Sequence, residues 1–433
     1  MSDLSDRLAA HVDLAGDFAL LSDLVAAVES REAVDDVVAA ALTDAGLGVE
    51  RLTYEPASVP MVGEFAAAQV VAAGPEQCVI GRQQAGAQDG PMGRSLVLFA
   101  HPDVEPFAPD PRWCTDPLVL SEADGKLFGW GVADDLCGIA TMVRAVALLK
   151  RAEVCPRGEL ILVSAPSKRH RRGMAAALAA GVSADGVVYC HPAESGAGLD
   201  EIKAFTPGQL EFTVRVEGQP PDTTEPAHTA FAHTAVNAMD EARPVLDTLK
   251  ALDRERAARL NHPRLESAIG RSTNLMISRC EFGVGGALSR LPSSLLIGGA
   301  MSLVPGERIE DAMGELEAAV DGSAAGARLG TNGAATITWV SAVSAAQTSP
   351  DDPLHRLTLD VLGNLGARSR VNALHTASDI RHPIVQRGIA TVGFGPRCGN
   401  LTMNGQANEW VEAADYGRAV IATALLAARW CQT

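Results

Sequence analysis

Apolar and polar positions divide the chain into segments with different periodicities. From residue 96 onward, short continuous apolar runs alternate with stretches of helical periodicity. Apolar runs of strand length between helices are typical of a mostly parallel sheet that is covered on both faces. We expect strands at 96–100, 159–165 and 186–190, and helices at 136–152 and 173–181. The pattern therefore predicts an α/β core.

The pattern changes after residue 207. Residues 210–218 alternate between apolar and polar side chains, as in an antiparallel strand with one exposed face. The elements expected next are a helix at 235–257, strands at 271–282 and 294–303, a helix from 305 and a strand at 334–343. Two strand–helix–strand units predict a small α+β (ferredoxin-like) domain inserted into the larger one.

The inserted domain is expected to end at a polar stretch, residues 346–353, which resembles a linker. A helix at 354–366 and a strand at 388–395 then resume the α/β pattern. The sequence thus predicts a catalytic domain formed by 1–207 plus 348–433 and a lid formed by 208–347. A length of 433 residues also favours two domains over one.

Composition narrows the range of partners and of cellular locations. The formal net charge is −17, which argues against nucleic acid as a partner, because phosphate binding depends on a basic face. We expect no membrane partner, since no window approaches roughly 18 unbroken apolar residues. The N-terminus is acidic, unlike a signal peptide, and the eight cysteines form no C-x-x-C pair. These features predict a cytoplasmic protein with reduced thiols.

Titratable side chains follow two of the expected strands and precede one expected helix. His101 and Asp103 come after the strand at 96–100, His191 comes after the strand at 186–190, and Asp134 stands with Asp135 before the helix at 136–152. Taken singly, these could be loop residues or, for the aspartates, helix N-caps. Together, two imidazoles and a carboxylate at the carboxyl edge of a sheet are a reasonable catalytic zinc site.

The order of motifs resembles the co-catalytic zinc metallopeptidases that include aminoacylase, acetylornithine deacetylase and succinyl-diaminopimelate desuccinylase. The shared features are H-x-D after a strand, G-x-G-x-x-D before a helix, a strand-end histidine followed by proline, an inserted lid, and a closing "GFGP…NEWV". The resemblance implies that His101 and His191 hold a first metal, that Asp134 bridges two metals, and that Asp103 orients His101.

The sequence departs from the family at the second metal. The family has Pro-x-Glu-Glu after the strand that corresponds to 159–165, where the first Glu is the general base and the next binds metal. Here Pro166 is followed by Ser167, Lys168 and Arg169, and Gly405 stands where the family has its second-metal histidine. We therefore expect one zinc per chain, with the second site lost.

The basic cluster, defined here as residues 168–172, suggests what occupies the lost site. The guanidinium of Arg169 or the ammonium of Lys168 would supply positive charge beside Asp134. Lys168 is further expected to have a lowered pKa and to act as base or nucleophile. Alternatively, Lys168, Arg171 and Arg172 form a solvated loop around a dead site, or His170 replaces a ligand.

Other site residues are expected in the lid and near the C-terminus. The resemblance implies that His228 reaches the active site of a neighbouring subunit and stabilises an oxyanion there, which makes a homodimer through the lid the expected assembly. His233 is the weaker candidate for that role. Arg169, His228 and Asn408 are the expected substrate-binding residues.

We thus expect an amide hydrolase or deacylase that uses one metal to act on a small N-acyl amino acid or peptide-like molecule. Its catalytic residues would be Asp103, Lys168 and His228, and its metal ligands would be His101, Asp134 and His191. The alternatives are an inactive binding protein and a repurposed acyl-transfer or condensation enzyme.

Overall fold

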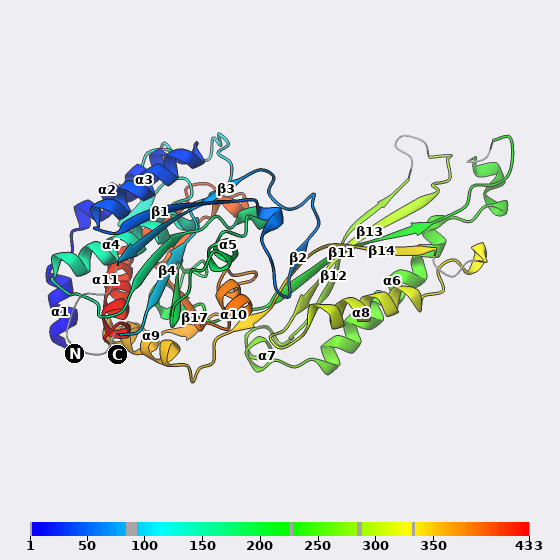
Figure 1. The fold of residues 1–433 in the computed structure, drawn as a ribbon. Helices are drawn as coiled ribbons and strands as arrows, with labels where there is room; N and C mark the ends of the chain where they lie inside the picture. Colours follow the sequence, from blue (N-terminus) through cyan, green and yellow to red (C-terminus); the bar gives the residue numbers. More distant parts are fainter. Residues whose placement is uncertain (1, 84–92, 226–227, 284–287, 331–333, 433) are drawn as a thin grey trace. The chain divides into compact units, whose positions relative to one another are not determined.

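A computed structural model describes residues 2–83, 93–225, 228–283, 288–330 and 334–432. Two compact units are present (Figure 1). The first unit comprises 1–62, 71–205 and 347–433, and the second comprises 63–70 and 206–346. The segment 63–70 belongs to the second unit, which the sequence pattern did not indicate. No helix in the described part of the chain is long and apolar enough to cross a membrane.

The first unit is built on a six-stranded sheet in the order β1-β3-β7-β4-β8-β17. Strands β7, β4, β8 and β17 run parallel, whereas β1 and β3 add an antiparallel edge. The strands are β1 (Gly48–Tyr54), β3 (Glu76–Gln83), β4 (Leu96–Ala100), β7 (Leu160–Ser164), β8 (Gly186–Cys190) and β17 (Thr391–Phe394). The predicted α/β core is therefore confirmed, with a mixed rather than wholly parallel sheet.

Helices cover both faces of this sheet (Figure 1). One face packs against α2, α3, α4, α9 and α11, and the other packs against α5 and α10. The helices of the unit are α1 (Ser2–Ala10), α2 (Leu14–Ala26), α3 (Arg31–Asp44), α4 (Cys137–Arg151), α5 (Gly173–Ala179), α9 (Pro353–Asn364), α10 (Arg381–Arg387) and α11 (Ala413–Trp430). Coverage of both faces explains why β4, β7 and β8 are buried at every position.

Short strands complete the first unit. A four-stranded sheet in the order β18-β19-β6-β5 and a parallel pair of β16 and β9 lie outside the main sheet. Their bounds are β5 (Ser121–Ala123), β6 (Lys126–Phe128), β9 (Glu201–Ile202), β16 (Arg370–Val371), β18 (Cys398–Gly399) and β19 (Trp410–Glu412).

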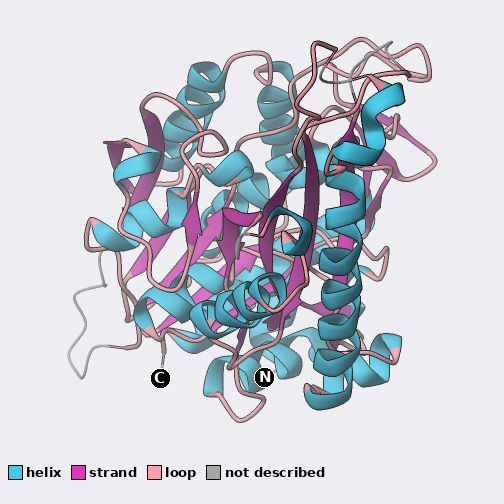
Figure 2. Cartoon of the chain, turned by 90° about the vertical axis from the view of Figure 1, so that its right-hand side faces the viewer, coloured by secondary structure: helices cyan, strands magenta, loops and turns pink. Residues whose placement is uncertain are grey.

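The second unit has one antiparallel sheet in the order β12-β13-β11-β14-β2, with its own apolar core. Helices and strands alternate along the chain as two strand–helix–strand units, which confirms the ferredoxin-like insertion. Figure 2 shows the helices and strands of the chain in separate colours. The elements are β2 (Phe65–Ala66), β11 (Gly208–Glu217), α6 (Ala238–Arg259), α7 (Pro263–Ile269), β12 (Leu275–Phe282), β13 (Ser294–Leu303), α8 (Ile309–Asp321) and β14 (Ala335–Val343). Along β11, inward apolar residues alternate with outward polar residues, as the sequence pattern predicts.

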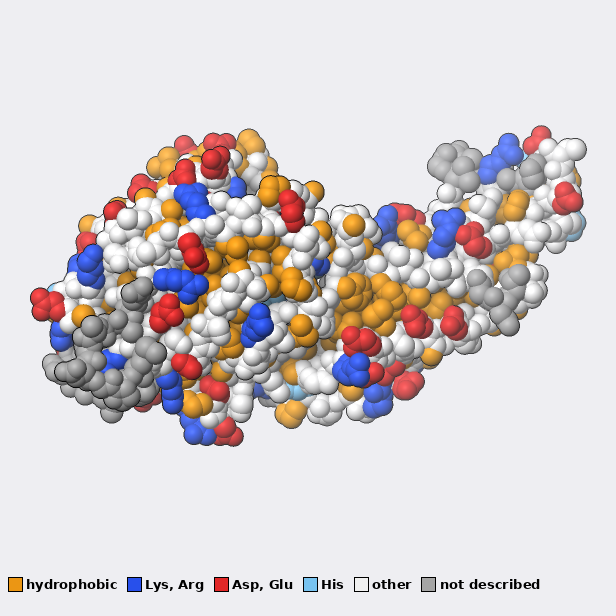
Figure 3. All heavy atoms as spheres, in the orientation of Figure 1, with side chains coloured by type: hydrophobic (Ala, Val, Ile, Leu, Met, Phe, Trp, Pro, Cys, Tyr) orange, Lys and Arg blue, Asp and Glu red, His pale blue; other side chains and the backbone are white. Residues whose placement is uncertain are grey.

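The surface carries both signs of charge. On the face shown in Figure 3, lysine and arginine side chains are interspersed with aspartate and glutamate. This distribution accompanies an overall excess of acidic residues, 53 against 36 basic ones.

Candidate metal centre

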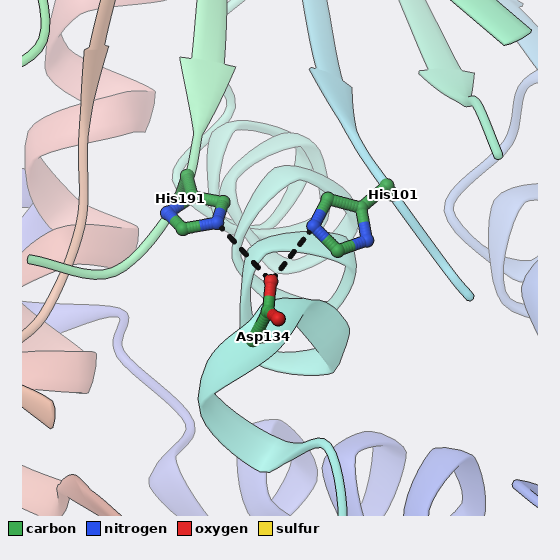
Figure 4. Close-up of side chains that lie close together, drawn as sticks. All are labelled: His101, Asp134 and His191. Carbon is green, nitrogen blue, oxygen red and sulfur yellow. Dashed lines mark ion pairs between the residues drawn. The ribbon is translucent and has the colours of Figure 1, made fainter. Parts of the chain in front are cut away.

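Two neighbouring strands and one turn bring three potential metal ligands together. His101 follows β4 and His191 follows β8, and these strands lie side by side in the sheet. Asp134 lies in the turn before α4 and points toward both imidazoles (Figure 4). Asp134 Oδ1 is 3.0 Å from His101 Nε2 and 3.5 Å from His191 Nε2. The three candidate ligands predicted from the sequence thus converge.

The geometry of this group fits a zinc ion. Tetrahedral zinc with ligand distances of about 2.0–2.1 Å requires ligand atoms about 3.3 Å apart, close to the two distances observed. One ligand atom from each residue lies within 4.8 Å of the others, and all three residues are buried. Among the described residues, this is the one such group of three or more His, Cys, Asp or Glu side chains.

Both imidazoles are oriented by contacts to their far nitrogens. His101 Nδ1 lies 3.1 Å from the Asp103 carbonyl oxygen and 3.4 Å from Asp103 Oδ1, and His191 Nδ1 lies 3.0 Å from the Pro192 carbonyl oxygen. These contacts favour a proton on Nδ1 and leave Nε2 facing Asp134. Such contacts are usual around metal-binding histidines.

Neither aspartate before α4 caps that helix. The helix N-cap is Leu136, without a side-chain hydrogen bond. Asp135 instead accepts a hydrogen bond from the His101 backbone N–H at 3.2 Å, and Asp134 faces the imidazoles. Gly131, with φ of +68°, makes the turn possible, because a Cβ there would lie 2.1 Å from Val104 Cγ1. The N-cap interpretation of the two aspartates is therefore wrong.

Asp103 links His101 to the start of the basic cluster. Its carboxylate accepts hydrogen bonds from the backbone N–H groups of Ser167 at 2.9 Å and Lys168 at 2.7 Å, and from Arg171 Nη1 at 3.1 Å. Burial would raise the pKa of Asp103, but His101 and nearby arginines and backbone donors hold it well below its usual range.

Lys168 is the cation that contacts Asp134. Its ammonium donates to Asp134 Oδ2, the carboxylate oxygen that does not face the imidazoles, and lies 3.6 Å from Glu105 Oε1. Burial alone would lower the pKa of Lys168, but Asp134, Asp103 and Glu105 raise it to about 12. In the metal-free chain these three carboxylates thus stabilise the charged ammonium, whereas the expected lowering depends on a zinc ion beside it and stays a prediction.

Arg169 does not contact Asp134. Its guanidinium lies 3.4 Å from Glu105 Oε2, and its side chain is 56% exposed. Of the two candidates for the cation beside Asp134, the structure thus places Lys168 there. Arg171 pairs with Glu76 at 2.6 Å, and buried Arg172 donates to the Pro56 carbonyl oxygen at 2.9 Å. Lys168, Arg171 and Arg172 consequently do not form the solvated loop that the sequence left open.

Three further residues adjoin this group that the sequence patterns did not single out. Glu194 Oε1 lies 3.7 Å from His191 Nε2, and Glu194 Oε2 lies 3.3 Å from His375 Nδ1. Burial would raise the pKa of Glu194, but His375 and His191 lower it to about 2. Buried Lys203 donates to the backbone behind His191. Of these three residues, Glu194 could have been found from the sequence, because it follows His191 by only three residues.

The remaining predicted site residues are Asn408, His228 and His233. Asn408 uses its side-chain amide to hold the loop at 112–114: its oxygen accepts from the Cys114 N–H at 2.6 Å and its nitrogen donates to the Arg112 carbonyl at 2.9 Å. His228 and His233 belong to the second unit. His228 Nδ1 accepts a hydrogen bond from the Ala230 N–H at 3.1 Å.

Two curated relatives share part of the sequence. The chain is 32% identical over 163 residues to a succinyl-diaminopimelate desuccinylase of Methylibium petroleiphilum, a match that covers 36% of this chain and 41% of the relative. It is 28% identical over 221 residues to the enzyme of the same name from Paracidovorax citrulli, covering 50% of this chain and 53% of that one. The matches thus span about half or less of these relatives.

Solved structures and a family model match far more of the chain. Aminopeptidase PepT from Bacillus cereus has a TM-score of 0.69 at 17% identity, with 96% of this chain and 99% of that one covered. A tripeptidase from Staphylococcus aureus has a TM-score of 0.71 at 15% identity, with 98% and 100% covered. At such identities these likenesses show the fold. The model of peptidase family M20/M25/M40 matches residues 97–429, and the chain therefore belongs to that family.

Proposed function

We propose that the protein is a hydrolase that uses one zinc ion to cleave an amide bond in a small N-acyl amino acid or peptide-like molecule. The observation that carries this proposal is the arrangement around Asp134. One carboxylate oxygen faces two buried imidazoles, and the other accepts from the Lys168 ammonium. One side of the carboxylate is thus suited to a metal ion, and the other side already has its cation.

Electrostatics favour a single ion. Two unit charges about 4 Å apart interact by about 4 kcal/mol near a protein surface, so a second dication beside the ammonium would be repelled by more than that. Lys168 is only 14% exposed, which limits solvent screening. The Lys168 ammonium therefore supplies positive charge beside Asp134 in place of the second ion of the family.

Each residue near the metal group has a separate task in this proposal. A bound zinc ion would polarise the scissile carbonyl and acidify water. His101, Asp134 and His191 would hold the ion, and Asp103 orients His101. Lys168 keeps its proton and balances the charge of Asp134. By family resemblance, His228 of a second subunit would donate a hydrogen bond to the oxyanion.

The proton acceptor is assigned by position. The Lys168 ammonium is engaged by Asp134 and Glu105, so we look for the base elsewhere. Glu194 Oε1 lies 3.7 Å from the metal-facing nitrogen of His191, and a carboxylate at that distance borders the reacting groups. We assign Glu194 Oε1 to accept the proton of the attacking water; because its lowered pKa makes it an ionised but weak base, a bound zinc ion would have to acidify that water.

The test is release of free amine from a panel of N-succinyl and N-acetyl amino acids and dipeptides by zinc-loaded protein. We expect turnover of at least one substrate, its loss in His191→Ala together with the zinc, and its loss in Glu194→Gln with the zinc retained. Zinc binding without turnover of any panel member would instead support the second candidate, a protein that binds such molecules without cleaving them. The observation that favours this alternative is the charged Lys168 at the place of the family's general base.

A further inference from the structure

We infer that Lys203 is a positioning residue that fixes the orientation of His191 toward the metal. This inference rests on the proposed metal centre and adds a residue to it. Lys203 directly follows β9, and its side chain is only 1% exposed. Neither the family motifs nor the strand-end pattern points to it.

The ammonium of Lys203 contacts the backbone that carries His191. Its Nζ donates to the Pro192 carbonyl oxygen at 2.6 Å and to the His191 carbonyl oxygen at 3.1 Å. The same Pro192 oxygen lies 3.0 Å from His191 Nδ1. One carbonyl group thus joins Lys203 to the imidazole, and its direction determines where His191 Nε2 points.

Strand β17 gives both residues a common support. Lys203 and Gly393 exchange two backbone hydrogen bonds of 2.7 Å, and the His191 N–H donates to the Phe394 carbonyl oxygen at 3.2 Å. Gly393 also allows the close approach, because a Cβ there would lie 3.2 Å from Lys203 Cβ. Lys203 is therefore held rigidly relative to the strand that supports His191.

A carboxylate also lies near the ammonium of Lys203. Glu201 Oε1 lies 3.7 Å from Lys203 Nζ, and its other carboxylate oxygen accepts from Ser195 Oγ. Burying an ammonium is costly unless it is hydrogen-bonded and paired. Here its hydrogen-bond acceptors are two carbonyls of the loop that carries a metal ligand, which indicates orientation of that loop rather than general packing.

The test compares Lys203→Met with wild type, using Lys150→Met as a control, because Lys150 is exposed on α4. Zinc affinity is measured by competition with a chromogenic chelator, and ligand geometry by the visible absorption spectrum of the Co²⁺-loaded protein. Outer contacts of metal ligands typically change metal affinity by about 10–100-fold. We expect Lys203→Met to lose zinc affinity within that range and to change the Co²⁺ spectrum, whereas Lys150→Met matches wild type.

If Lys203 had a purely structural role, Lys203→Met would lower the Tm of the metal-free protein. The Kd for zinc and the Co²⁺ spectrum of the folded variant would then match wild type, and that result would overturn the inference. If Lys203→Met does not fold, Glu201→Gln and Ser195→Ala are measured in its place. We expect these variants to lose zinc affinity by roughly 3–10-fold, because they act on Lys203 only indirectly. A wild-type Kd for zinc in both variants would overturn the inference. Absence of zinc binding in wild type would instead refute the proposed metal centre, and the inference with it.

Discussion

At the scale of single residues, the charge of Lys168 decides how this chain departs from its family. The family has its general-base glutamate at this point, whereas the Lys168 ammonium supplies a positive charge beside Asp134. The ion pair is largely removed from solvent, with exposed fractions of 14% for Lys168 and 5% for Asp134. Asp134 therefore remains ionised: burial would raise its pKa, but His101, His191 and Lys168 hold it well below its usual range.

Replacement of Lys168 by methionine tests this role. Lys168→Met removes the cation and keeps most of the side-chain volume, so zinc should stay bound, with its affinity unchanged or higher. Turnover should fall by about 10²–10³-fold, as when one electrostatic group is removed from an active site. Lys150→Met is the control for loss of a lysine. Wild-type kcat/KM in Lys168→Met would remove Lys168 from the mechanism.

Asp35 provides a pH test away from the metal. Burial raises its pKa to about 6, partly offset by Arg31. A raised carboxyl pKa means that the folded chain binds the proton more tightly than the unfolded chain, so stability is lost as pH rises from about 4 through 6. Between about pH 4 and 7, the Tm of Asp35→Asn should rise by roughly 2–4 °C relative to wild type. Asp36→Asn, at an exposed neighbouring position, should show no such trend.

Sequence patterns identified the candidate ligands but not the charges around them. His101, Asp134 and His191 stand out because each adjoins a predictable strand or helix end. The pKa of Lys168 depends on Glu105, Asp103 and Asp134, which approach it only in the folded chain. The contacts of Lys203 and His375 likewise join segments that no local pattern brings together.

At the scale of elements, the parallel strands were predictable and the first ninety residues were not. Continuous apolar runs predicted β4, β7 and β8 within about one residue. In α2 and α3, by contrast, buried Asp17 and Asp35 interrupt the apolar face and are compensated by ion pairs with Arg144 and Arg31. The two-residue strand β2 exists only through its pairing with β14.

The contact between α4 and β8 is the element-scale feature on which the metal group depends. A Cβ on Gly138 would lie 2.0 Å from the Cys190 carbonyl oxygen and 2.3 Å from Asp135 Oδ1. Gly138→Ala should therefore push the start of α4 away from β8, destabilise the fold by about 1–3 kcal/mol, and weaken zinc binding. The measurements are Tm and the Kd for zinc.

Gly363→Ala is the matched control. Gly363 lies in α9, and nothing lies within 4 Å of the position that a Cβ would take there. Alanine should therefore leave Tm unchanged or raise it through helix propensity. Equal behaviour of the two alanine variants would contradict the proposed packing constraint at Gly138.

At the scale of the whole molecule, the second unit is expected to mediate dimerisation, as the family resemblance implies. Its sheet ends at β12, where Met276 is 59% exposed. Such an edge can pair with a second chain. Light scattering should give twice the chain mass of 45.1 kDa, and Met276→Lys should shift the protein toward monomer.

Leu374→Lys is the control for the dimer prediction, because Leu374 is 54% exposed in the first unit. It should leave the mass unchanged. A monomeric wild type, or a Met276→Lys variant that remains wholly dimeric at low micromolar concentration, would contradict dimerisation through this strand.

In the proposed metal centre, Asp134 shares its carboxylate between one metal ion and the Lys168 ammonium. Its most direct test is the zinc content of the protein after saturation with zinc and removal of excess metal, measured by elemental analysis in wild type and in His101→Ala. A carboxylate shared in this way should give close to one zinc per wild-type chain and almost none in the variant. Two zinc ions per wild-type chain, or none, would contradict it.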